Sequence, residues 1–238
     1  NVDFQTDSIY CLGVGGGENY RRKEVKVERV EMTTVVRNLG PGIMETLDAY
    51  LAIPANLDNQ KLLGEPVFSP QPTDFLTDQW GQKVAHFHSI KSFPGSTARF
   101  SMTVSAQIWD TRYYLFPEHV GKLDNVPREV RDKYLADDEK FDLKNPIIQK
   151  AVKEAVGEEK NPYWIMRKIF RYIITHLEYE LSGGWNTAPA VLTRGNGSCS
   201  EYTFVFLSMC RAAGLPARYA GSVVIRNDDA SIDDVFHR

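Results

Sequence analysis

The sequence predicts an α+β protein, with a β-rich N-terminal half followed by a helical C-terminal half. Between residues 22 and 108, apolar side chains recur at every second position, which is typical of strands with one buried face. From Val126 onward they recur at helical spacing. Turn signals such as Asn38-Leu39-Gly40-Pro41-Gly42 and Pro94-Gly95 separate the alternating runs at intervals typical of an antiparallel sandwich. We therefore divide the chain into a β-sandwich domain at 1–118 and a second domain at 119–238.

Three alternating runs define the predicted strands of the first domain. They cover residues 25–36, 47–53 and 100–108. In the first run the apolar positions change phase between Val27 and Val30, which predicts a β-bulge there.

Prolines mark the predicted helix starts of the second domain. Pro127, Pro146 and Pro162 each open a helical pattern at the first turn, where a missing N–H costs little. The predicted helices cover 127–136, 146–156 and 162–180. His176 lies on the apolar face of the third, so we expect a helix-end residue stacked on the core rather than a catalytic one.

Composition excludes several classes of protein. Of the 238 residues, 42% are hydrophobic, which is enough for one large or two modest cores. The net charge of −3 gives no reason to expect nucleic acid or an anionic membrane surface as a partner. No apolar run approaches the ~18 residues of a membrane span. The three cysteines, Cys11, Cys199 and Cys210, are too scattered for a disulfide framework or a zinc site.

Cys199 is the candidate nucleophile. Ser198 and Glu201 have the S-x-x-E spacing of a capping box, which predicts that Ser198 caps a helix whose first residue is Cys199. The free N–H groups and the dipole at that helix end favour the thiolate, which is the reactive form. A single cysteine at such a position is nevertheless more often structural than catalytic.

A histidine downstream strengthens the catalytic interpretation. Residues 217–226 read as a strand, an acidic loop follows, and a second strand begins at 235 and carries His237. A helix-borne cysteine and a strand-borne histidine form the pair that nucleophilic thiol catalysis requires. Arg218 and Tyr219 are expected in the first of these strands, packed against the cysteine helix.

The run GNGSCSEYTFVFLSMCRAAGLPARYAGSVVI, followed by FH, resembles the core of the transglutaminase-like superfamily. It is most similar to the bacterial and archaeal members described as cysteine proteases. The resemblance implies a papain-like core of helices on an antiparallel sheet, preceded by an immunoglobulin-like domain, and a Cys-His-Asp triad. Cys199 matches the nucleophile and His237 the general base. A prokaryotic protein of this kind could be cytoplasmic or extracytoplasmic.

The resemblance also implies a mechanism. The Cys199 thiolate would attack an amide of a peptide or protein and form a thioester, with an oxyanion held by the Cys199 N–H and a second donor from Trp185 or Tyr179. Trp185 could equally pack its loop onto the core. Water would give hydrolysis and a second amine would give cross-linking. A noncatalytic binding or scaffold role of the same fold is the third alternative.

The family's acid lies on a strand after the histidine, whereas this sequence ends at Arg238. We therefore expect a core that is incomplete after His237, with an antiparallel sheet that lacks its last strands. Without the acid to orient the imidazole, this stretch alone should be weakly active or inactive.

No cofactor or metal is expected. Gly13 to Gly17 lacks the GK[ST] signature of a phosphate-binding loop. His86 and His88 point to one face of a strand, but the sequence reveals no third ligand beside them. The four aspartates at 228, 229, 233 and 234 match no chelating loop, so a solvated hairpin tip is favoured.

Overall fold

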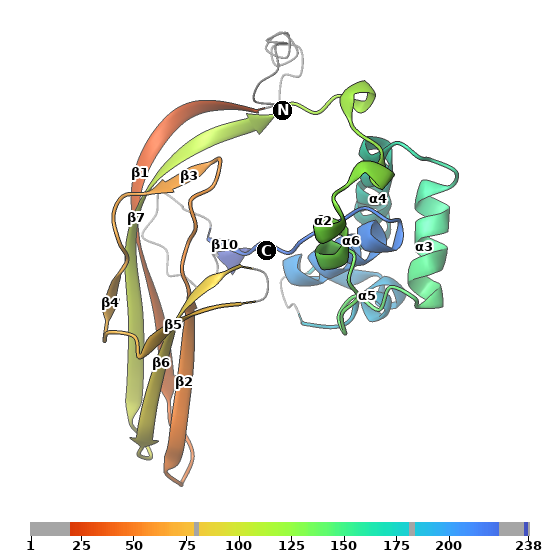
Figure 1. Ribbon diagram of the computed structural model, residues 1–238. Coiled ribbons are helices and arrows are strands. Elements are labelled where there is room, and N and C mark those ends of the chain that lie inside the picture. The colour runs from red at the N-terminus through yellow and green to blue at the C-terminus, as the bar shows by residue number, and fades with distance from the viewer. Residues whose placement is uncertain (1–19, 79–80, 181–183, 224–235, 238) are drawn as a thin grey trace. The chain divides into compact units, whose positions relative to one another are not determined.

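The computed structural model describes the chain except for residues 1–19, 79–80, 181–183, 224–235 and 238. The chain divides into two compact units, Asn1–Tyr114 and Leu115–Arg238, which we call the N-terminal and C-terminal units (Figure 1). Each has its own cluster of buried hydrophobic residues, and each is described separately below. None of the helices within the described ranges is long and apolar enough to cross a membrane.

Two antiparallel sheets build the N-terminal unit (Figure 1). In the first sheet the long strands β1 (Tyr20–Arg37) and β7 (Thr97–Tyr113) pair along their whole length. The short strands β3 (Gln60–Leu62) and β4 (Val67–Ser69) lie against the other edge of β7. In the second sheet β6 (Lys83–Ser92) lies between β2 (Met44–Ala52) and β5 (Asp74–Thr77).

The core of this unit draws on both sheets. Alternate residues of β2 and β6, including Leu51 and Phe87, meet Phe100 and Met102 of β7 in one buried cluster. The predicted alternating runs at 47–53 and 100–108 lie on these strands, so the period of two located the buried faces correctly. The sequence therefore predicted a two-sheet core that the structure contains.

The predicted bulge within the first run is wrong. β1 pairs with β7 without interruption from Val25 to Arg37, and the register shift lies earlier, between Lys23 and Val25. Val25 and Val27 are exposed, whereas Val30 packs against the core. The apolar phase changes because the two valines belong to the other face of the strand, not because a residue is inserted.

Helices dominate the C-terminal unit. Two 3-10 turns, η2 (Pro117–His119) and η3 (Leu123–Asn125), lead into α2 (Arg128–Tyr134) and α3 (Pro146–Val156). Next come α4 (Pro162–His176), α5 (Ala188–Arg194) and α6 (Cys199–Ala212). The starts of α3 and α4 follow the prolines as predicted, with Asn145 and Asn161 accepting hydrogen bonds from the first turns. The third predicted helix ends at His176, whose ring stacks on Tyr172 at a centroid distance of 3.8 Å.

Helix α6 lies at the centre of this unit, in contact with α3, α4 and α5 (Figure 1). Val205, Met209 and Cys210 are buried, as the helical spacing predicted, but so are Phe204 and Leu207 on other sides. A helix that is buried nearly all round is held in place from several directions. The residue at its N-terminus is therefore fixed by the core of the unit.

The strands of the C-terminal unit are short. β8 (Glu178–Tyr179) pairs in parallel with β9 (Asn196–Gly197), whereas the sequence led us to expect only antiparallel pairing. β10 (Ser222–Val223) pairs antiparallel with β11 (Phe236–His237). Arg218 and Tyr219 are not in a strand, which corrects that prediction, although the Tyr219 ring does stack on Phe204 of α6 at 5.9 Å.

Candidate active site

Cys199 is the first residue of α6, as the capping-box spacing predicted. Ser198 is the N-cap residue in extended conformation, and its backbone N–H donates to the Glu201 carboxylate at 3.0 Å. The thiol-bearing residue is half-buried, and its carbonyl accepts a hydrogen bond of 2.8 Å from the Thr203 hydroxyl. The first turn of α6 is thus fixed by its own side chains, which leaves the Cys199 side chain at the positive end of the helix.

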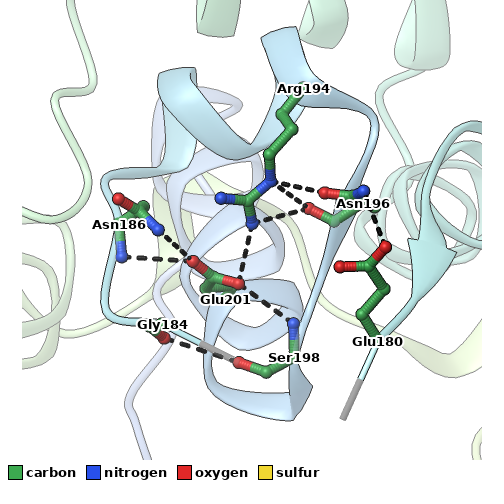
Figure 2. Close-up of polar contacts among 7 residues, drawn as sticks. All are labelled: Glu180, Gly184, Asn186, Arg194, Asn196, Ser198 and Glu201. Atoms are coloured by element: carbon green, nitrogen blue, oxygen red, sulfur yellow. Dashed lines mark hydrogen bonds and ion pairs between the residues drawn. The ribbon is translucent and has the colours of Figure 1, made fainter. Parts of the chain in front are cut away.

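The Glu201 carboxylate joins three segments at the start of α6 (Figure 2). Its Oε1 accepts from the side-chain amide of Asn186 at 2.7 Å and from the Asn186 backbone N–H at 3.2 Å. Its Oε2 accepts from Ser198 N and, at 2.9 Å, from the Arg194 guanidinium. Loop, α5 and helix cap therefore converge on one fully buried carboxylate.

Glu201 is ionised in this setting. Burial opposes its negative charge, but hydrogen bonds from Asn186 and Ser198 and the Arg194 charge outweigh that penalty and lower the pKa of Glu201 from 4.5 to about 2. A buried carboxylate whose two oxygens both accept hydrogen bonds rigidifies the groups around it. The Glu201 cluster, defined as Asn186, Arg194, Ser198 and Glu201, therefore holds in place the start of α6, where Cys199 lies.

Glycine leaves room where the chain passes this carboxylate. A Cβ on Gly197 would lie 3.0 Å from Glu201 Cβ and 3.2 Å from Val191 Cγ1, closer than such atoms normally approach. Gly184 is similarly crowded, since a Cβ there would lie 2.7 Å from the Asn186 amide nitrogen. The glycine that precedes Ser198 and Cys199 is thus explained by packing against Glu201 and Val191.

The two candidate second donors for an oxyanion are both half exposed. Trp185 packs its ring against Phe204 of α6, with centroids 5.6 Å apart. Tyr179 pairs with Gly197 through β8 and β9, and its ring meets the edge of Tyr202 at 5.9 Å. Both therefore belong to segments that touch the cysteine helix. Their role toward a substrate stays a prediction.

His237 lies on β11, in register with Ser222 on β10. The segment that leads from α6 to β10 is anchored by Arg211, which donates to the Ala217 carbonyl at 3.0 Å and to the Ala136 carbonyl at 2.6 Å. Burial lowers the pKa of Arg211, against the attraction of nearby aspartates, and its guanidinium lies over the Phe141 ring. Arg211 therefore holds the first part of the segment between α6 and β10 against the end of α6.

The other thiols are placed differently. Cys210 is buried on the same helix, and burial raises the pKa of its thiol to about 12. It is a core residue, as expected. Cys11 lies outside the described residues, as do the glycine-rich run at 13–17 and the acidic loop at 228–234.

The histidine pair of the N-terminal unit has a neighbour that the sequence did not reveal. His88 on β6 lies opposite Asp48 on β2, and the Asp48 carboxylate reaches both His86 and His88. The expectation of no third ligand beside the pair is therefore wrong. Strand register brought the aspartate there, from a position 38 residues before His86.

Sequence reasoning found Cys199, Ser198 and Glu201 but missed Asn186, Arg194 and the constraint on Gly197. The S-x-x-E spacing was the only available signal for this cluster. A buried carboxylate at the third helical position needs more hydrogen-bond donors than its N-cap residue provides. For Glu201 these donors come from the preceding loop and helix.

Comparison with known proteins bears on the same region. The model of the transglutaminase-like superfamily core matches residues 149–237, a range that holds both Cys199 and His237. No curated protein matches the chain. A solved structure described as "a Putative Cysteine Protease from Cytophaga hutchinsonii" is similar in fold, with a TM-score of 0.69 and 15% sequence identity. The similarity covers 92% of this chain and 73% of that one. Residues 149–237, within the C-terminal unit, therefore match the core of the transglutaminase-like superfamily.

Proposed function

We propose that this protein is a thiol hydrolase that cleaves amide bonds of peptides or proteins through a thioester on Cys199. The observation that carries the proposal is the position of Cys199 as the first residue of α6, inside the matched superfamily core. The Glu201 cluster supports it, because a nucleophile gains most from rigid placement. His237, within the same core, is the proposed general base.

The proposed reaction has two half-reactions. His237 takes the proton of the Cys199 thiol, and the sulfur attacks the amide carbonyl carbon. The C–N bond then breaks, the amine leaves with the proton from the imidazolium, and a thioester remains. Water, deprotonated by the imidazole, attacks the thioester and releases the acid and the thiol. We propose that the Cys199 N–H and a donor from the Trp185 or Tyr179 segment hold the oxyanion in both steps.

Two alternatives share these residues. In a protein-glutamine acyltransferase a second amine, not water, attacks the thioester. In a noncatalytic scaffold the same fold binds a partner without chemistry. The supporting features of the fold are common to all three, namely two antiparallel sheets around one core and a buried central helix. We interpret these units as an immunoglobulin-like sandwich and a papain-like core.

The test is labelling of the protein by a peptide that carries a thiol-reactive warhead. We expect Cys199 to be modified first, and Cys199→Ala to abolish labelling. Cys210→Ala is the matched control, because it removes a thiol from the same helix that is buried and whose pKa is raised. His237→Ala should slow labelling of Cys199 without unfolding the protein, as circular dichroism would verify.

The outcomes separate the alternatives. If Cys199 reacts no faster than a cysteine in an unfolded peptide, the catalytic proposal fails and the scaffold alternative stands. If it reacts fast, incubation of a glutamine peptide with a labelled amine distinguishes the two enzymes. Release of ammonia or of a peptide fragment without incorporation of the amine supports hydrolysis, whereas incorporation supports the acyltransferase.

A further inference from the structure

The outward face of the second sheet in the N-terminal unit carries a group of imidazoles and carboxylates. His86 and His88 project from β6 on the side opposite the buried Ala85 and Phe87. Register places Asp48 of β2 opposite His88 and Asp74 of β5 opposite His86. Three neighbouring strands thus deliver ligand-type side chains to one place.

One carboxylate oxygen lies within hydrogen-bond distance of both imidazole rings. Asp48 Oδ1 lies 2.7 Å from His86 Nε2 and 2.9 Å from His88 Nδ1. The ligand atoms of Asp48, His86 and His88 all lie within 4.8 Å of one another. In a tetrahedral zinc site with bonds of about 2.0–2.1 Å, neighbouring ligand atoms are about 3.3 Å apart. Small side-chain rotations therefore convert the present arrangement into a chelate.

The His86 ring is oriented for this role from three sides. Its Nδ1 lies 3.1 Å from Asp74 Oδ1, which leaves Nε2 directed at Asp48. The Tyr50 ring stacks on it at 4.7 Å with an interplanar angle of 9°. A carboxylate on the far nitrogen is the usual outer partner of a metal-bound imidazole, because it fixes the tautomer and the ring orientation.

The two carboxylates around His86 favour a positive charge at this place, which either a second ring proton or a bound cation supplies. Both His86 nitrogens face carboxylates, but a neutral imidazole carries only one N–H. If Nδ1–H is donated to Asp74, the Nε2 lone pair faces the negative Asp48. A divalent ion between them would receive both the lone pair and the carboxylate, and its charge would balance the two aspartates.

We propose that His86, His88 and Asp48 bind a divalent transition-metal ion of the zinc class, with Asp74 as the outer partner of His86. Two imidazoles and one carboxylate suit zinc rather than calcium or magnesium, which prefer oxygen ligands alone. The side chains of His88 and Asp48 are each 40% exposed, so an ion can enter and a further ligand position faces solvent. The ion would tie β2 to β6.

Zinc titration of the whole chain by calorimetry tests the site, after the thiols have been blocked by alkylation so that cysteine ligands do not contribute. We expect one ion per chain with a dissociation constant of about 1 μM or lower. His88→Gln and Asp48→Asn should each weaken binding at least about tenfold, since each removes a ligand. Asp74→Asn should weaken it by about 10–100-fold as an outer partner. His119→Gln, at an exposed histidine outside the group, is the matched control and should bind as the parent does.

Cobalt gives a second measurement, which reports the ligands of the bound ion and not the strength of binding. Co²⁺ bound to the thiol-blocked chain should show intense visible bands of a low-coordinate nitrogen and oxygen site, and His88→Gln should abolish them. Absence of saturable zinc binding would overturn the proposal. So would equal binding by the parent, His88→Gln and Asp48→Asn, because the ion would then be held elsewhere. Thermal unfolding checks that each variant is folded. We expect His88→Gln and Asp48→Asn to fold, because both side chains are partly exposed.

Discussion

At the scale of single residues, Glu201 decides how the cysteine is presented. It is a fully buried anion, and a buried charge is tolerated only when its partners are in place. The S-x-x-E spacing predicted its bond to Ser198. Its bonds to Asn186 and Arg194 depend on how a loop and α5 fold back on α6, and no local pattern encodes that.

We predict that Glu201→Gln destabilises the C-terminal unit in a pH-dependent way. The pKa of Glu201 is about 2 in the fold and 4.5 as its ordinary value, so ionised Glu201 stabilises the fold above pH 4.5. The 2.5-unit difference corresponds to about 3 kcal/mol at neutral pH. That contribution is lost as the pH falls from 4.5 towards 2. The parent should therefore be more stable than the variant at pH 7, with the gap closing in acid.

Urea unfolding at a series of pH values measures this gap. Glu129→Gln is the matched control, because Glu129 is an exposed glutamate at the start of α2 and should give no difference at any pH. A gap between Glu201→Gln and the parent that stays constant from pH 7 to pH 3 would contradict the assignment of an ionised, hydrogen-bonded carboxylate.

At the scale of elements, the helices were predicted better than the strand contacts. Prolines and asparagines mark the starts of α3 and α4 within the local sequence, so their first residues were found. Strand partners depend on register between distant segments. The alternation in β2 and β7 correctly gave their buried faces, yet the contact between Asp48 of β2 and His88 of β6 on the other face of the second sheet follows only from the pairing.

The contact between β9 and α6 yields a prediction about Gly197. Gly197→Ala should destabilise the protein by about 1–3 kcal/mol, because its Cβ would overpack against Glu201 and Val191. It should also slow labelling of Cys199 by shifting the helix start. Gly121→Ala is the control, since a Cβ at Gly121 meets nothing within 4 Å and should change stability by less than about 0.5 kcal/mol. Equal unfolding midpoints for the two variants would show that the start of α6 accommodates the added methyl group without a loss of stability.

At the scale of the whole molecule, two cores that share no residues define the units. The N-terminal cluster includes Met102 and the C-terminal cluster includes Ile169, and both side chains are fully buried. The change from a strand to a helical period already indicated two cores in the sequence. The candidate nucleophile could also be predicted from the sequence, because Ser198, Cys199 and Glu201 lie in one short motif. The group of Asp48, Asp74, His86 and His88 could not be predicted as a whole, because three strands that are separated in the sequence assemble it.

Separate cores predict separate unfolding. Met102→Ala should cost about 2–5 kcal/mol through the cavity it leaves, and so should Ile169→Ala. Because opening free energies follow cooperative units, Met102→Ala should lower hydrogen-exchange protection in β2, β6 and β7 but leave α3, α4 and α6 as protected as in the parent. Ile169→Ala should do the reverse, so each variant is the control for the other. Exchange followed by mass spectrometry measures both units in one sample. Loss of protection across both units in either variant would mean that the chain unfolds as a single cooperative body.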